Sequence, residues 1–200
     1  MGSWPKMMFN YPDGATPLTS DEVKGLLQPH ITTHAELNEW EQSNILSAES
    51  WAFSRKRSDH TSERFIRRVH KKMFGNTWKW AGSFRSTEKN LGLRPGYQIS
   101  EGIRTLIDDV EFWLEHETYP IDEIAARFHH KLVFIHPFPN GNGRHARLMA
   151  NIMLFNLGAS LFTWGSGDLY NTGEVRQRYI LALREADRSN FDPLLLFVRS

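Results

Sequence analysis

The sequence predicts an all-α fold with one short β-hairpin, and three observations lead to this class. Apolar residues recur at three- and four-residue spacing through most of the chain from about residue 33 to residue 198. Turn and capping residues separate these periodic segments. The stretch 83–99 alone lacks helical periodicity between two helical segments, and a turn signal lies inside it.

The N-terminal third predicts an irregular arm followed by two helices. Residues 1–31 are rich in proline and glycine, with one short helix expected from Ser20 to Leu27. A capped helix begins at Thr32 or Thr33, and its apolar stripe includes Leu37, Trp40, Ile45 and Ala48. The next helix spans 61–74, because its apolar residues share one face and glycine follows.

The remaining segments predict a hairpin and five more helices. Arg94-Pro95-Gly96-Tyr97 is a turn signal, so a flap is expected at Gly92, Leu93, Arg94, Pro95, Gly96, Tyr97, Gln98 and Ile99. Pro120 indicates a helix start, His136-Pro137 ends that helix, and Gly158 ends the one after it. The expected helices are 103–114, 120–135, 143–156, 172–187 and 191–198.

Composition narrows the class of protein. Two hundred residues, 40% of them hydrophobic, suit one domain over residues 35–198 with an N-terminal arm at 1–34. A net charge of +1 gives no general attraction to nucleic acid, and no apolar run reaches membrane-spanning length. Because cysteine is absent, disulfides and thiolate metal sites are excluded. We therefore expect a cytoplasmic protein with neither membrane nor nucleic acid as a direct partner.

The segment from His136 to Arg147, His-Pro-Phe-Pro-Asn-Gly-Asn-Gly-Arg-His-Ala-Arg, predicts a phosphate site beside an imidazole. Gly141 and Gly143 allow close approach to backbone N–H groups, and a helix N-terminus adds its dipole. Arg144 and Arg147 share a helical face, where guanidinium groups grip phosphate oxygens. Arginine near a helix N-terminus is unfavourable without an anion, which favours a bound anion here.

Each of these features also has a plain structural interpretation. His136 could cap the preceding helix, Gly-Asn-Gly occurs in ordinary turns, and paired arginines often form a solvated face. Phe138 is expected to point inward and anchor the loop. Zinc binding by the four histidines is a rival, disfavoured because none are spaced i, i+4. Trp78 and Trp80 could stack on bases, but packing suits them better because no basic stripe surrounds them. The four histidines of the zinc alternative are His129, His130, His136 and His145.

The chain resembles the Fic/DOC family, whose motif is His-x-Phe-x-(Asp/Glu)-Gly-Asn-Gly-Arg-x-x-Arg. The matching residues are His136, Phe138, Gly141, Asn142, Gly143, Arg144 and Arg147. Val69–Phe74 followed by Trp80-Ala81-Gly82 also resembles a family segment. The likeness covers roughly residues 35–198 and is nearest to the subgroup labelled "mobile mystery protein B".

The resemblance implies a Fic-like helical fold and transfer of AMP from ATP to a Tyr, Ser or Thr hydroxyl of a target protein. His136 would be the general base. Gly141, Asn142 and Gly143 would hold the α- and β-phosphates, and Arg144 and Arg147 the β- and γ-phosphates. The target would lie along the flap as an added strand.

The resemblance also raises questions about metal, donor and regulation. Asn140 stands where the family usually has an acid that holds Mg²⁺, so weaker metal binding, low activity or another phosphate-containing donor is implied. A catalytically weak nucleotide-binding or toxin–antitoxin module is a further alternative. Thr32-Thr33-His34-Ala35-Glu36 resembles the family's inhibitory pattern, with Glu36 expected to pair with Arg147. A capped helix explains Glu36 equally well, and an antitoxin-like partner could carry the inhibitory helix instead.

Overall fold

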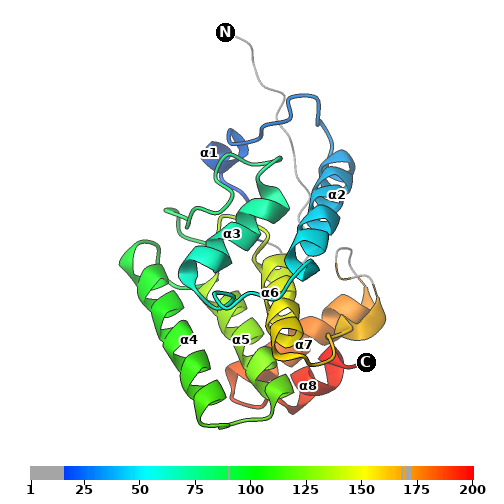
Figure 1. Ribbon diagram of the computed structural model, residues 1–200. Coiled ribbons are helices and arrows are strands. Elements are labelled where there is room, and N and C mark those ends of the chain that lie inside the picture. Colours follow the sequence, from blue (N-terminus) through cyan, green and yellow to red (C-terminus); the bar gives the residue numbers. More distant parts are fainter. Residues whose placement is uncertain (1–15, 90, 168, 170–172) are drawn as a thin grey trace.

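The computed structural model describes residues 16–89, 91–167, 169 and 173–200, which form helices joined by loops (Figure 1). The all-α prediction is confirmed, since the described residues contain no strand beyond one isolated bridge, Leu26 to Trp78. The first fifteen residues of the predicted arm lie outside this range. The helices are α1 (Ser20–Val23), α2 (His34–Phe53), α3 (Glu63–Phe74), α4 (Tyr97–Glu115), α5 (Ile121–Ile135), α6 (Asn142–Leu157), the 3₁₀ helix η1 (Trp164–Ser166), α7 (Glu174–Asp187) and α8 (Asp192–Val198).

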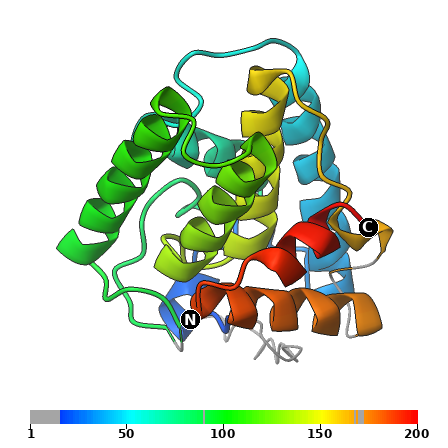
Figure 2. The ribbon, with the colours of Figure 1, turned by 90° about the horizontal axis from the view of Figure 1, so that it is seen from below.

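The centre of the fold is the α5–α6 pair. α4 packs on α5, and α3 and α2 pack against α6, while α8 contacts α5 and pairs with α7. The view from below shows α7 and α8 lying across the ends of the central helices (Figure 2). The core is continuous between these layers, and the largest fully buried side chains include Phe65, Phe128, Phe138 and Ile103. The bend between α5 and α6 is therefore enclosed by other elements.

The helices begin and end at ordinary capping residues. Thr33 caps α2 and forms a capping box with Glu36, and Ser62 caps α3. Gly158, with φ of 77°, ends α6 in the left-handed conformation expected of a C-terminal glycine. α1 is shorter than predicted, because Thr19 is its cap and Lys24 already ends it.

The predicted β-hairpin at residues 92–99 is wrong. Residues 91–96 form an irregular loop, and Tyr97, Gln98 and Ile99 belong to the first turn of α4. The reason is that Ile99 and Ile103, four residues apart, are both fully buried on one helix face, so the helical pattern extends further than expected. Gly96, with φ of 86°, is the residue before the helix rather than a hairpin tip. The N–H of Leu93 donates to the Ile135 carbonyl at 3.3 Å instead of to a partner strand.

The helices that the structure describes include none long and apolar enough to cross a bilayer.

Candidate active site

Two left-handed residues shape the bend between α5 and α6. His136 follows the last residue of α5 with φ of 51° and ψ of 58°, and its N–H donates to the Leu132 carbonyl at 3.1 Å. Gly141 precedes α6 with φ of 77°. A Cβ at Gly141 would lie 2.5 Å from the Phe74 ring, so only glycine fits both the backbone and the space. His136 is therefore the C-cap residue of α5 and also lines the cavity described below.

The loop between these residues is fixed by Phe138 and Asn142. Phe138 is fully buried, which confirms its predicted anchoring role. The Asn142 side chain accepts from the Phe138 N–H at 2.9 Å and donates to the Phe138 carbonyl at 2.8 Å. No side chain caps the start of α6, which leaves its N-terminus available to an anion.

The His70 ring packs against the loop and bonds to it, a role that the sequence did not predict. Its ring stacks on Phe138 with centroids 3.7 Å apart. Its Nδ1 accepts from the Gly82 N–H at 3.0 Å, and its Nε2 is 3.1 Å from the Asn140 carbonyl, to which it donates. Burial holds the pKa of His70 well below its usual value, so the ring stays neutral at pH 7. His145 is likewise buried, and its Nε2 lies 2.9 Å from the Ile66 carbonyl.

His136 faces a hydroxyl. Its Nε2 lies 2.9 Å from the Thr16 Oγ1. Burial lowers the pKa of His136 to about 4, with a smaller contribution from the nearby Arg85 guanidinium, while the Val133 carbonyl acts in the opposite direction. The neutral imidazole at pH 7 is therefore a proton acceptor.

Arg85 ties the loop before α4 to the bend. It is buried, and its Nε donates to the His136 carbonyl at 2.7 Å. Its other nitrogens donate to the carbonyls of Thr87 and Leu93. No motif points to Arg85, because its role depends on the distant His136 carbonyl as well as on carbonyls of its own loop.

The two motif arginines have different surroundings. Arg144 forms a 2.5 Å ion pair with the buried Glu41 of α2, and Glu41 also accepts from Trp78 Nε1 at 2.6 Å. Arg147 lies over the Tyr179 ring, 5.6 Å from its centroid. Tyr179 and His129 share a hydrogen bond of 2.9 Å. Their arrangement leaves Arg144 held by an acid and Arg147 beside an aromatic ring.

The predicted pairing of Glu36 with Arg147 is corrected by these contacts. Glu36 accepts hydrogen bonds from the N–H groups of Thr32 and Thr33 at 2.8 and 3.0 Å, so its carboxylate caps α2. The acid that reaches a motif arginine is Glu41, five residues further along, and its partner is Arg144. The signal that could have found Glu41 is its position on the buried face of α2, four residues after Leu37 and four before Ile45.

A cavity of about 550 Å³ joins these groups. The described residues that line it include Thr16, His136, Asn140, Gly141, Asn142, Gly143, Arg144 and Arg147, and it continues along α7 to Tyr179 and Leu183. The structure thus brings together the whole predicted phosphate site. Of the predicted flap, Gly92 reaches the cavity wall, whereas Ile99 is buried in the core.

The rival uses of the histidines and tryptophans are not supported by their surroundings. In the described part of the chain, no three His, Asp or Glu side chains gather as a metal site would require. His130 instead pairs with Asp187 at 2.8 Å. Trp78 is buried and stacks on Trp80 with centroids 5.0 Å apart, which confirms packing as its use.

Comparisons with known proteins agree with this geometry. Residues 60–154 match the model of the Fic/DOC family. The chain is 32% identical over 151 residues to the protein adenylyltransferase fic-1 of Caenorhabditis elegans, covering 72% of this chain and 27% of that protein. It is 35% identical over 94 residues to a probable protein adenylyltransferase of Aquifex aeolicus, covering 46% of this chain and 25% of that protein. The chain thus spans about a quarter of the length of these relatives.

Solved structures show the same fold. Fic-1 (residues 134–508) from C. elegans superposes with a TM-score of 0.62 and 25% identity, covering 91% of this chain and 57% of that one. BepC from Bartonella tribocorum, with bound AMPPNP, gives a TM-score of 0.63 at 19% identity, covering 84% and 87%. Together with the motif in the α5–α6 bend, these matches establish that residues 60–154 form a domain of the Fic/DOC family.

Proposed function

We propose that this chain is a protein adenylyltransferase that transfers AMP from ATP to a hydroxyl of a target protein. The observation that carries the proposal is a neutral imidazole whose Nε2 already contacts a side-chain hydroxyl at 2.9 Å, beside an uncapped helix N-terminus. A general base needs this reach to the proton that it removes. The relatives named adenylyltransferases and the neighbour with bound AMPPNP support ATP as the donor.

We assign the following chemistry to these groups. The Nε2 of His136 takes the proton of the target hydroxyl, and the oxygen attacks the α-phosphorus of ATP. The bond from that phosphorus to the bridging oxygen breaks, and pyrophosphate leaves. The N–H groups at the start of α6 stabilise charge on the phosphate oxygens. Arg147 then holds the outer phosphates and sets the in-line geometry.

Glu41 competes with phosphate for Arg144. The carboxylate and the guanidinium are both largely buried, so their attraction is weakly screened. A phosphate that reaches Arg144 must displace or share this contact. The chain therefore supplies an acidic partner for Arg144 from α2, whereas the inhibitory glutamate, from Glu36 or an antitoxin-like protein, was expected at Arg147.

The described residues that line the cavity do not form a resident magnesium site. Asn140 offers one neutral oxygen, which already accepts from the Gly141 N–H at 2.7 Å and lies 3.4 Å from an Arg144 nitrogen. Asp187 is the only carboxylate among the described residues that line the cavity, and it pairs with His130. Since Mg²⁺ prefers charged oxygen ligands, any Mg²⁺ enters with its substrate ATP.

The test incubates wild type or His136→Asn with cell lysate, Mg²⁺ and ATP, and determines the mass and amount of the adducts on target proteins by mass spectrometry. Asparagine suits the left-handed backbone at this position and removes the base. We expect AMP-sized adducts on target proteins, reduced by about 10²–10⁴-fold in the variant. Phosphate-sized adducts would favour another transfer from ATP, and nucleotide binding without any adduct would favour a binding module. Equal labelling by both proteins would contradict the proposal.

A further inference from the structure

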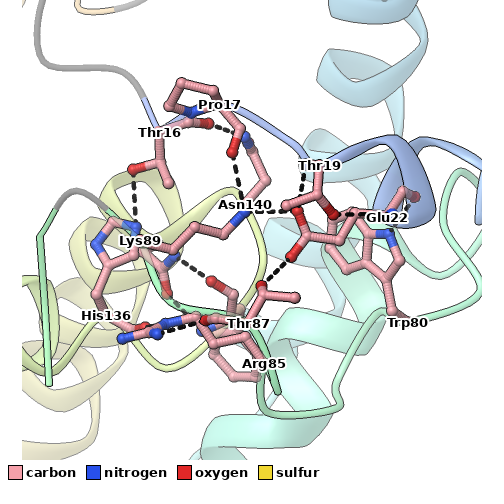
Figure 3. A network of polar contacts seen from close by, with 12 residues as sticks. Thr16, Pro17, Thr19, Glu22, Trp80, Arg85, Thr87, Lys89, His136 and Asn140 are labelled. Atoms are coloured by element: carbon pink, nitrogen blue, oxygen red, sulfur yellow. Dashed lines mark hydrogen bonds and ion pairs between the residues drawn. The ribbon is translucent and has the colours of Figure 1, made fainter. Parts of the chain in front are cut away.

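An N-terminal segment, residues 16–22, enters the candidate site and places a hydroxyl on the catalytic imidazole (Figure 3). Thr16 is only 7% exposed, and its Oγ1 is the group that contacts His136 Nε2. Thr16, His136 and residues Gly141–Gly143 line the same cavity. The Thr16 hydroxyl therefore occupies the place that the proposed mechanism assigns to the hydroxyl of a target protein.

This segment is held by specific polar contacts from two other parts of the chain, the bend at Asn140 and the loop before α4. The Asn140 side chain donates to the Thr16 carbonyl at 2.9 Å, and Lys89 donates to the Pro17 carbonyl at 2.9 Å. Glu22 pairs with Lys89 at 2.5 Å and accepts from the Thr87 hydroxyl at 2.6 Å. Figure 3 shows these groups converging around residues 16–22. These contacts hold the chain at and after Thr16, and they fix the position of its hydroxyl.

The Asn140 contact explains why an amide stands at this motif position. Its Nδ2 donates to the Thr16 carbonyl while its Oδ1 accepts from the Gly141 N–H, so one side chain joins the segment to the phosphate loop. A carboxylate could accept from Gly141 but could not donate to Thr16, and two oxygens would then face each other. The residue that makes a poor metal ligand is therefore well suited to hold Thr16 in place.

We propose that Thr16 is an intramolecular acceptor of AMP, so that the protein adenylylates its own N-terminal segment; this inference rests on the proposed function. His136 Nε2 takes the Thr16 hydroxyl proton, and Oγ1 forms a bond to the α-phosphorus of ATP. The bond between that phosphorus and the bridging oxygen breaks, and pyrophosphate departs. Holding the hydroxyl in place gives this reaction the advantage of an intramolecular step.

The product would occupy the site. An AMP group on Thr16 remains tethered beside His136, where a target hydroxyl must otherwise bind. Self-modification and target modification therefore compete, and removal of the Thr16 hydroxyl is expected to increase labelling of targets.

The experiment incubates the purified full chain with Mg²⁺ and ATP, without any other protein, and locates adducts by intact-mass and fragment-mass spectrometry. We expect one AMP-sized adduct at position 16 in wild type and in Thr16→Ser, and no adduct at this position in Thr16→Val. The matched control is Ser20→Ala, because Ser20 is an exposed hydroxyl on the same segment. That variant should be modified like wild type.

Two further measurements separate the possible outcomes. The modified fraction should not depend on protein concentration, and Thr16→Val should not modify added His136→Asn protein, since the reaction is intramolecular. Lysate labelling by the same preparations tests the proposed function separately. Target adducts that depend on His136, with Thr16 unmodified, would overturn this inference and leave the proposed function intact. Loss of adducts from both targets and Thr16 would overturn both.

Discussion

The bend at residues 136–147 and the segment at residues 16–22 meet at one imidazole but are held in different ways. The bend is fixed by apolar burial and by bonds between neighbours, such as Asn142 to Phe138. The segment is fixed by polar contacts to distant residues, of which Asn140 to Thr16 spans 124 positions. Each such hydrogen bond contributes only about 0.5–1.5 kcal/mol net, whereas burying a large apolar side chain contributes about 1.5–3 kcal/mol.

The difference indicates that the segment can leave while the bend keeps its shape. A target protein that enters the cavity must displace Thr16 from His136, which costs a few polar contacts that water or the target can replace. The bend needs no change, because its backbone is held by the Asn142–Phe138 bonds and the buried Phe138 ring, and none of these involves residues 16–22. The molecule thus combines a rigid bend for the phosphates with an acceptor hydroxyl, that of Thr16, which can be displaced.

The largest expected effect breaks the bend itself. Phe138→Ala removes a fully buried ring from between His70 and His145, and we expect a loss of about 3–5 kcal/mol in the free energy of unfolding. Denaturant titration measures it. The control is Phe112→Ala on α4, which is 53% exposed and should change stability by about 0.5 kcal/mol or less. Similar losses in the two variants would show that the loop does not depend on Phe138.

Acid is expected to destabilise the fold, and the contribution of each single histidine is smaller than that of Phe138. Burial lowers the pKa of His136 and His145 to about 4 and that of His129 to about 3, below the value of 6.5 expected when unfolded. The unfolded chain therefore binds more protons below pH 6.5, and stability falls as pH drops toward 4, by up to about 1.4 kcal/mol per pH unit for each group.

Melting temperatures between pH 7.5 and 4.5 check this effect. His145→Gln keeps a donor for the Ile66 carbonyl but does not titrate in this range, so its stability should fall less steeply with acid than that of wild type. An identical slope would mean that His145 does not contribute.

A smaller effect, on the affinity for ATP, tests the role of the ion pair between Glu41 and Arg144. Glu41→Gln keeps an acceptor for Trp78 Nε1 and removes the charge that competes for Arg144. Because a charge-assisted contact contributes about 1.5–3 kcal/mol, ATP should bind about tenfold more tightly or better. Calorimetry measures the dissociation constant, with Glu39→Gln as the exposed control on the same helix. Unchanged affinity in Glu41→Gln would remove Glu41 from the account.

The smallest effect on stability is expected from a substitution at Asn140, the residue that joins the segment at residues 16–22 to the bend. Asn140→Asp loses the donor to Thr16 and gains a magnesium ligand, so we expect less adduct on Thr16, tighter Mg²⁺ binding and faster target labelling. The free energy of unfolding should change by only about 0.5–1.5 kcal/mol, the value of one hydrogen bond. Equal activity and metal dependence in both forms would show that Asn140 has neither role.

Local features of the sequence predicted the bend, whereas contacts between distant segments could not be predicted from it. His136-Pro137, the two motif glycines and the apolar spacing of α5 and α6 each act within a few residues, so their structure follows from local rules. Thr16, Arg85 and His70 carry no local signal, because their roles arise only when distant segments meet. The hairpin was predicted wrongly because Pro95-Gly96 marks a turn without showing whether a strand or a helix follows it.

The central claim is that the bend holds a polyphosphate next to the His136 ring, and NMR on histidine-labelled protein tests it most directly. The ring signals of His136, assigned by their loss in His136→Asn, should shift on titration with MgATP, reach saturation and stay unchanged with adenosine. The same titration of Arg147→Ala should need clearly more ATP. Saturable ATP binding that leaves the His136 signals unmoved would contradict the account.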